Sequence, residues 1–210
     1  MFGSHDDDAL KAEVAGWTDS RFFAEPDQIY SYSNPGYWLA GLLAETVGGR
    51  PFADQVAETI FKPLGMTRST FRPTLAMTFP LAQGHDLVNG KPQIVRPAAN
   101  NSASWPAGSI YSNVIDLSRW ITAFINGGVV GGEQALPASV FTTLMRPRAT
   151  IPGATNRYGY GVQVGQWRGL DVVEHGGSRS GYGSIIRMVP SRKFGVVVLA
   201  NRTGVSLTQT

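Results

Sequence analysis

Apolar residues recur at helical spacing in separate stretches before about residue 158 and at a period of two after it. The helical spacing predicts one helix over 36–47, ended by Gly48 and Gly49, and a second one between Pro51 and Pro63. The apolar residues that define these two helices are Tyr37, Trp38, Leu39, Leu42, Leu43, Val47, Phe52, Val56 and Ile60. We therefore expect the chain to begin with a mainly helical part.

Two more helices are expected in the middle of the chain. Asn113 suits an N-cap, Asp116 follows three residues later, and the Asn-Gly-Gly run at 126–128 supplies an end. The buried stripe of this helix would consist of Leu117, Trp120, Ile121 and Phe124. A short fourth helix is expected to begin at Pro137, because proline suits a helix start. Its buried side would carry Val140, Phe141 and Leu144.

The segment 67–111 lies between the second and third helices and carries few periodic apolar residues. Its prolines are Pro73, Pro80, Pro92, Pro97 and Pro106. Proline interrupts both helices and central strands, so this segment is expected to be a long ordered loop or lid without regular structure.

After about residue 158 the pattern changes to alternating apolar positions and short β-branched runs. Strands are predicted at 159–166, 170–175, 182–189 and 194–200, and short connections between them imply an antiparallel sheet. One of these connections is expected to contain Gly176-Gly177. The predicted fold class is α+β, with a helical lobe over 1–157, a sheet portion over 158–210 and one cleft shared between them.

Composition narrows the possible partners. The 210 residues include 42% hydrophobic and 16% charged residues, enough for a sizeable core, and no cysteine for disulfides or thiolate metal sites. The net charge of +3 is modest and the arginines are scattered, so nucleic acid is not an expected partner. His5, His85 and His175 are too far apart in sequence to indicate a metal site. The first residues lack the basic start and apolar stretch of a signal peptide.

Two short stretches carry candidate chemistry. Tyr32-Ser33-Asn34 stands just before the first apolar helix, and His175-Gly176-Gly177 stands at the end of a predicted strand. No serine is followed three positions later by lysine: the residues at that distance before the four lysines are Asp8, Thr59, Val88 and Pro190. A second Tyr-x-Asn triplet, at 111–113, is interpreted as structural because Asn113 is accounted for as a helix cap.

Four stretches in this order resemble the serine β-lactamase-like hydrolases, which include class C β-lactamases, D-alanyl-D-alanine carboxypeptidases and related esterases. They are Tyr-Ser-Asn-Pro-Gly-Tyr-Trp-Leu-Ala-Gly at 32–41, Pro-Leu-Gly-Met-Thr at 63–67, Pro-Ala-Gly-Ser at 106–109 with Asp-Leu-Ser-Arg-Trp at 116–120, and Glu-His-Gly-Gly at 174–177. Together they cover about 25–202, and four ordered motifs are far more specific than any one of them.

The resemblance implies a β-lactamase/transpeptidase-like fold and an acyl-enzyme mechanism without a metal or organic cofactor. A serine hydroxyl needs a base within hydrogen-bond reach, and the resemblance gives that role to a tyrosine. The catalytic residues that it implies are Tyr32, Asn34 and His175, and the substrate-binding residues are Gly176, Gly177, Ser178 and Asn201. One oxyanion-hole N–H would come from Ser178. The substrate would be a small-molecule ester, amide, β-lactam or peptide.

The family carries its Ser-x-x-Lys nucleophile motif and further strands well before the Tyr-x-Asn, and this chain has 31 residues there. It is therefore expected to be truncated at both ends, lacking the nucleophile and part of the sheet. A face of the strand 194–200, bearing either Val196, Val198 and Ala200 or Val197 and Leu199, is expected to be under-covered, which would favour self-association. The parent protein would be periplasmic or secreted by resemblance.

Many β-lactamases have Lys-Thr-Gly where this chain has His175-Gly176-Gly177. A neutral histidine and a missing hydroxyl attract a substrate carboxylate less, which favours an esterase or amidase over a dedicated β-lactamase. Without its nucleophile this chain is expected to be inactive alone. The alternatives are a remnant without function, a pseudoenzyme that binds peptidoglycan-like or acyl ligands, and an unrelated α+β binding domain.

Overall fold

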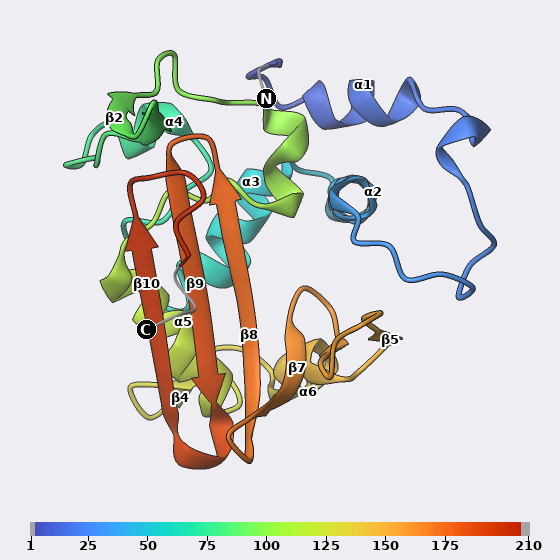
Figure 1. The fold of residues 1–210 in the computed structure, drawn as a ribbon, viewed down its shortest axis with the longest axis vertical. Coiled ribbons are helices and arrows are strands. Elements are labelled where there is room, and N and C mark those ends of the chain that lie inside the picture. Colours follow the sequence, from blue (N-terminus) through green and yellow to red (C-terminus); the bar gives the residue numbers. More distant parts are fainter. Residues whose placement is uncertain (1–2, 207–210) are drawn as a thin grey trace.

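Six antiparallel strands in the order β10-β9-β8-β7-β6-β5 form the main sheet of the computed structural model, which describes residues 3–206 (Figure 1). The strands are β5 (Ala149–Thr150), β6 (Arg157–Tyr158), β7 (Gln163–Trp167), β8 (Leu170–Arg179), β9 (Tyr182–Val189) and β10 (Phe194–Ala200). The antiparallel sheet expected from the period of two is thus confirmed. The last four residues of the expected sheet portion lie outside the described residues.

The first predicted strand, at 159–166, is wrong at its start, because β7 begins only at Gln163. Gly161 has a φ of 76°, a left-handed conformation outside the range of regular strand residues. The chain therefore turns between β6 and β7 at this glycine.

Strand β8 is longer than predicted, and this correction changes the setting of His175. The strand continues through Gly176 and Gly177, which pair with Ile185 and Ser184 of β9, and the turn comes after Arg179. Glycines carry no side chain and so interrupt an apolar pattern without interrupting the hydrogen-bonded ladder. His175 therefore lies inside a strand and not at its end.

The predicted helices are confirmed, with changes at their ends. The helices are α1 (Ala9–Ala15), α2 (Asn34–Gly48), α3 (Phe52–Val56), α4 (Pro73–Ala76), α5 (Val114–Ile125) and α6 (Ala138–Met145). Helix α3 continues as a π-helical turn, Ala57–Phe61, and short 3₁₀ segments occupy Asp19–Arg21, Ser102–Ala107 and Pro190–Arg192. Gly49 ends α2 in the left-handed conformation, with φ of 64°. Val140 is exposed, contrary to expectation, because α6 turns Phe141 to the core.

Helix α5 packs against one face of β10 and β9, behind the sheet in Figure 1. The approach is close: a Cβ on Gly195 of β10 would lie 2.4 Å from Cγ2 of Ile121. Around this contact lies the main core, which contains Ala53, Phe61, Leu64, Met66, Phe71, Trp105, Ile121, Ala123, Phe124, Phe141, Val173 and Met188. Trp105 is thus a packing residue.

The segment 67–111 contains more regular structure than its prolines indicate. Strands β1 (His85–Val88) and β2 (Lys91–Ile94) form a hairpin whose two turn residues, Asn89 and Gly90, both have positive φ. Asn-Gly is the preferred residue pair for such a turn. The sequence therefore contains a hairpin signal at 89–90, which the prolines of the segment outweighed in the prediction.

Outside this segment, a second small hairpin joins β3 (Val129–Val130) and β4 (Glu133–Gln134).

Buried Asp116 ties the start of this segment to α5. Its Oδ2 accepts hydrogen bonds from the backbone N–H of Arg68 and from the Ser69 hydroxyl, both at 2.8 Å. Asn113 caps α5 as expected, since its side-chain oxygen accepts from the N–H groups of Ile115 and Asp116. The second Tyr-x-Asn triplet therefore has a structural role.

Apolar side chains remain exposed on several elements, among them β10 and α2. On β10, Val196 is 41% and Leu199 is 38% exposed, so each face of this edge strand keeps an uncovered apolar residue. On α2, three exposed residues four positions apart form one stripe: Leu39, Leu43 and Val47. No helix within residues 3–206 is long and apolar enough to cross a membrane.

Candidate active site

The first motif is arranged by the start of α2. Ser33 is the N-cap, and its hydroxyl accepts a hydrogen bond from the backbone N–H of Gly36 at 3.0 Å. Tyr32 therefore lies in the extended segment before the helix, whereas Asn34 begins the first turn. Both side chains are exposed. The cap residue thus stands between the two candidate catalytic residues and fixes where the helix begins relative to both.

The second motif lies on a strand with one open edge. Strand β7 pairs with β8 only as far as Glu174, so among the described residues β8 has no partner strand on that side from His175 to Arg179. An unpaired edge presents backbone N–H and C=O groups that an extended ligand can pair with. Gly176 and Gly177 add no side chains that would keep such a ligand away from the backbone.

Tyr32 and His175 meet in the folded chain. Their ring centroids are 6.1 Å apart with an angle of 30° between the planes, a stacked arrangement. Tyr32 is 53% exposed and so remains accessible on its outer side. The two motifs that the sequence places far apart therefore lie together, beside the open edge of β8.

Tyr158 of β6 is part of this cluster and was missed from the sequence. Its hydroxyl lies 3.0 Å from Nε2 of His175, and the rings of Tyr30 and Tyr32 lie 5.9 and 6.0 Å from its own ring. Only 9% of Tyr158 is exposed, and this burial raises its pKa far above the usual value. No motif marks the residue, because its two-residue strand follows a loop without apolar periodicity.

Burial keeps His175 neutral. Removing the imidazole from water lowers the pKa of His175, and this effect outweighs the hydrogen bond to the Gly176 backbone and the charge of Glu174, which both raise it. A neutral imidazole does not supply the positive charge that would make a tyrosine hydroxyl acidic. Any cation that activates Tyr32 must come from another group.

The remaining predicted site residues are in contact with loops near β8. The hydroxyl of Ser178 accepts from the backbone N–H of Gly204 at 3.0 Å, and the amide of Asn201 donates to the Gln83 carbonyl at 3.0 Å. These bonds hold the loops at the end of β8. The expected substrate contacts of Ser178 and Asn201 stay predictions.

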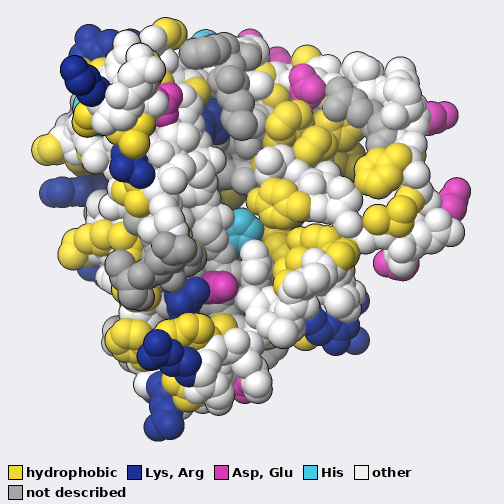
Figure 2. All heavy atoms as spheres, in the orientation of Figure 1, with side chains coloured by type: hydrophobic (Ala, Val, Ile, Leu, Met, Phe, Trp, Pro, Cys, Tyr) yellow, Lys and Arg dark blue, Asp and Glu magenta, His cyan; other side chains and the backbone are white. Residues whose placement is uncertain are grey.

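Hydrophobic side chains gather around a hollow between the N-terminal segment and the sheet on the face shown in Figure 2. In that N-terminal segment, three large apolar side chains are strongly exposed: Phe22 (78%), Phe23 (74%) and Ile29 (61%). Ile29 lies three positions before Tyr32 in the chain. The segment that leads to the candidate base therefore exposes several large apolar side chains.

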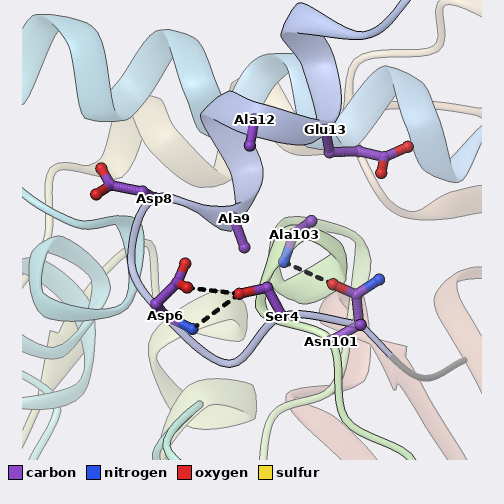
Figure 3. Close-up of a pocket in the computed structure, with 9 residues that line it drawn as sticks. Ser4, Asp6, Asp8, Ala9, Ala12, Glu13, Asn101 and Ala103 are labelled. Carbon is purple, nitrogen blue, oxygen red and sulfur yellow. Dashed lines mark hydrogen bonds between the residues drawn. The ribbon is translucent and has the colours of Figure 1, made fainter.

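A separate cavity of about 470 Å³ lies between α1 and the 3₁₀ segment at 102–107 (Figure 3). Three acidic residues line it, Asp6, Asp8 and Glu13, and the Ser4 hydroxyl donates to Asp6 at 2.6 Å. No group of three His, Cys, Asp or Glu side chains within residues 3–206 is placed to hold a metal ion. The cavity includes none of the three candidate catalytic residues.

Comparison with known proteins gives a consistent result. The model of the family described as Beta-lactamase matches residues 6–208. An unguisins hydrolase of Aspergillus violaceofuscus is 29% identical over 201 residues, which cover 86% of this chain and 35% of that protein. Penicillin-binding protein 4 of Amycolatopsis lactamdurans is 26% identical over 203 residues, covering 93% and 53%.

Among solved structures, the octameric penicillin-binding protein homologue from Pyrococcus abyssi superposes with a TM-score of 0.80 at 25% identity. The superposition covers 92% of this chain and 43% of that one. The chain thus spans 35% and 53% of the length of the two curated relatives.

Proposed function

The chain belongs to the β-lactamase family, whose members include serine acyl hydrolases, and from this we propose that Tyr32, Asn34 and His175 form part of an acyl-transfer site. The site would act on small esters or amides through an acyl-enzyme. Its nucleophile would come from a Ser-x-x-Lys segment, which is not found within these 210 residues. The observation that carries the proposal is the stacking of Tyr32 on His175 beside the open edge of β8.

In this proposal Tyr32 is the base that takes the proton of the attacking serine. A phenol with a pKa near ~10 is protonated at neutral pH and accepts a proton well only if a nearby cation stabilises its anion. His175 is neutral because it is buried, so the lysine of the Ser-x-x-Lys segment would provide that cation. Tyr32 of this chain and the lysine of that segment would then act together in the proton transfer.

The open edge of β8 supports the same reaction from the substrate side. Backbone N–H groups aimed at a developing oxyanion commonly lower the barrier by about 3 to 4 kcal/mol each. We assign one of them to Ser178 and expect the other from the nucleophile itself. The glycines at 176 and 177 leave room for the carbonyl to reach this edge.

The neutral state of His175 also bears on the substrate. A substrate carboxylate would find no charge at this imidazole, and the segment before Tyr32 offers exposed apolar side chains to an uncharged acyl group. We therefore propose an ester or amide substrate in preference to a β-lactam that is held by its carboxylate.

Intact mass spectrometry tests the proposal. The purified chain is incubated with a fluorophosphonate and, separately, with a penicillin, and no adduct is expected from either. The same chain fused after a Ser-x-x-Lys segment from a family member is expected to gain one fluorophosphonate adduct, which changing that serine to alanine abolishes. A stoichiometric adduct on the unfused chain would show that one of its own serines is the nucleophile. A folded fusion that gains no adduct would contradict the acyl-transfer role.

A second candidate is a non-catalytic binder of acyl ligands, favoured by the lack of any serine three positions before a lysine. The gene sequence upstream of Met1 separates the two. An in-frame Ser-x-x-Lys there supports the hydrolase, whereas a stop codon followed by the Met1 start supports the binder. Titration of the chain with N-acyl-D-alanine esters, followed by NMR, would show binding without turnover in the second case.

A further inference from the structure

Arg179, the last residue of β8, has a buried charged nitrogen without a partner. Its Nη2 is buried and makes no hydrogen bond to any residue in the range 3–206. No carboxylate in this part of the chain forms an ion pair with it. Two other partly buried arginines, Arg72 and Arg187, are each paired with at least one carboxylate. Arg179 therefore lacks the compensation that these two side chains have.

The charge of Arg179 persists despite its burial, because a guanidinium is not deprotonated in proteins. Burial lowers the pKa of Arg179 and the phenol of Tyr111 raises it, and neither of these influences is a carboxylate. A buried charge that no opposite charge compensates costs free energy in the folded state. A bound anion would remove this cost.

The position of Arg179 connects it with the candidate site. His175, Gly177 and Arg179 alternate along β8 in an unbroken register with β9, so they lie on one face of the sheet. Their strand reaches the upper end of the sheet in Figure 1. Four strand residues span about 13 Å between His175 and Arg179. Both residues lie on the part of β8 whose edge is open, so a ligand extended along that edge runs from one toward the other.

A free hydroxyl lies between them on the same face. Ser184 of β9 is the cross-strand partner of Gly177, and a Cβ on this glycine would lie 2.9 Å from Oγ of Ser184. Among the described residues this hydroxyl has no hydrogen-bond partner. The face therefore presents a neutral imidazole, then a free hydroxyl, then an unpaired guanidinium.

We propose that Arg179 is a substrate-binding residue that holds a carboxylate of the substrate, with the Ser184 hydroxyl as a second donor. A guanidinium binds a carboxylate through two parallel hydrogen bonds, which neither an imidazole nor a hydroxyl can make. His175 offers no charge to an anion, so the cation of this site lies at Arg179, four residues farther along the strand.

This placement narrows the substrate class. The substrate would be an ester or amide that carries a carboxylate in addition to its reacting carbonyl. The carbonyl would lie at the N–H of Ser178 and the carboxylate at the guanidinium of the next residue. The substrate assignment rests on the proposed function, whereas anion binding by Arg179 does not.

NMR of the full chain tests anion binding without any turnover. The probes are N-acetylglycine and N-acetylglycinamide, which differ in the charge of one end. The side-chain Nε–H signals of arginine are followed in ¹⁵N spectra, and the signal lost in Arg179→Gln assigns the residue. The acid is expected to shift this signal saturably and the amide to leave it in place. No shift with the acid, or equal shifts with both probes, would overturn the proposal.

Variants separate a specific site from a general effect of charge. Arg179→Gln is expected to weaken N-acetylglycine binding about tenfold or more, because hydrogen bonds to a charged group are lost. Arg179→Lys keeps the charge without the planar fork and should lie between the two. Ser184→Ala should give a smaller loss.

The matched control is Arg192→Gln, which removes one positive charge from an exposed side chain after the other end of β9 and should leave binding unchanged. Equal losses in Arg192→Gln and Arg179→Gln would contradict the site. If Arg179→Gln does not fold, the acid and amide titrations of the parent protein and of Arg179→Lys decide.

The Ser-x-x-Lys fusion tests the substrate class. The ratio of kcat/KM for a phenyl ester that carries a carboxylate to that for its uncharged methyl-ester counterpart is expected to fall about tenfold in Arg179→Gln, and to stay constant in Arg192→Gln. A chain that binds N-acetylglycine at Arg179 in a fusion that takes up no fluorophosphonate refutes the proposed function alone. A reactive fusion whose ratio is unchanged in Arg179→Gln refutes the role of Arg179 alone.

Discussion

The ring of Tyr32 stacks on the imidazole of His175, although one residue precedes the first long helix and the other lies in the third-last strand. The site is therefore assembled only when the helical part closes on the sheet. Stability and site geometry depend on the same contacts, and the variants below are chosen to separate them.

Tyr32→Phe is expected to slow fluorophosphonate labelling of the Ser-x-x-Lys fusion by about 100-fold or more, because a positioned base commonly contributes about 10²- to 10⁴-fold. Folding should be unaffected, since Tyr32 is 53% exposed. Labelling rates measured by intact mass decide the point, with Tyr160→Phe as the matched control. Equal rates for the two variants would remove Tyr32 from the role of base.

The stability of the chain is expected to fall as the pH drops below about 6.5, the pKa of an unperturbed histidine. Burial lowers the pKa of His175 in the folded state, so between the two pKa values the unfolded chain binds more protons. The contribution is complete above the unfolded pKa and is lost as the pH falls through the folded one. Urea midpoints from pH 7.5 to 5 measure it.

His175→Gln supplies the comparison for this pH dependence. The substitution changes stability at every pH, because it also alters the contact with Tyr158, but it should flatten the slope between pH 7.5 and 5. Parallel curves for the two proteins would show that His175 titrates alike in the folded and unfolded chain.

Gly41→Ala is expected to destabilise the fold by about 1 to 3 kcal/mol, as overpacking of a close contact does. A Cβ on Gly41 would lie 2.2 Å from Cγ of Pro106, so α2 and the segment 102–107 would have to move apart. Gly36→Ala, in the first turn of the same helix, meets nothing nearer than 3.4 Å and should be neutral or stabilising. Thermal unfolding of both variants is the measurement, and equal losses would argue against a tight contact at residue 41.

The chain is expected to self-associate at high concentration through its exposed apolar surfaces. Sedimentation velocity over a concentration series detects this. If the stripe on α2 is responsible, Leu43→Lys should reduce association; if the edge strand is responsible, Val196→Lys should do so. A stable monomer at every concentration would show that neither apolar surface drives association in solution.

Long periodic elements were predictable from this sequence. Helix α5 begins at the expected cap, Asn113, and ends at the expected Asn-Gly-Gly, because both signals are local. Strands β9 and β10 were predicted with their bounds for the same reason. Strand β8 was cut short, since its glycines 176 and 177 erase the side-chain pattern while their backbone pairing continues.

The site was predictable to the extent that it depends on ordered motifs. Tyr32 and His175 could be paired from the sequence because each stands in a recognisable stretch. The contact of Tyr158 with His175 could not be predicted, because no pattern in its two-residue strand indicates a buried hydroxyl near an imidazole. A neutral His175 was expected from the ordinary pKa of an imidazole, whereas the further lowering of that pKa follows from burial, which depends on the folded chain.

Ser33 stands between the two candidate catalytic side chains and touches neither role directly, yet its cap sets where α2 begins. Replacing Ser33 with alanine would remove the cap and let the first turn fray, so Tyr32 and Asn34 would lose their fixed relative aim while keeping their chemistry. In the Ser-x-x-Lys fusion such a substitution is expected to slow fluorophosphonate labelling although both candidate side chains remain. The middle residue of the Tyr-x-Asn motif, which can in general be any residue, here fixes the relative orientation of the two side chains beside it.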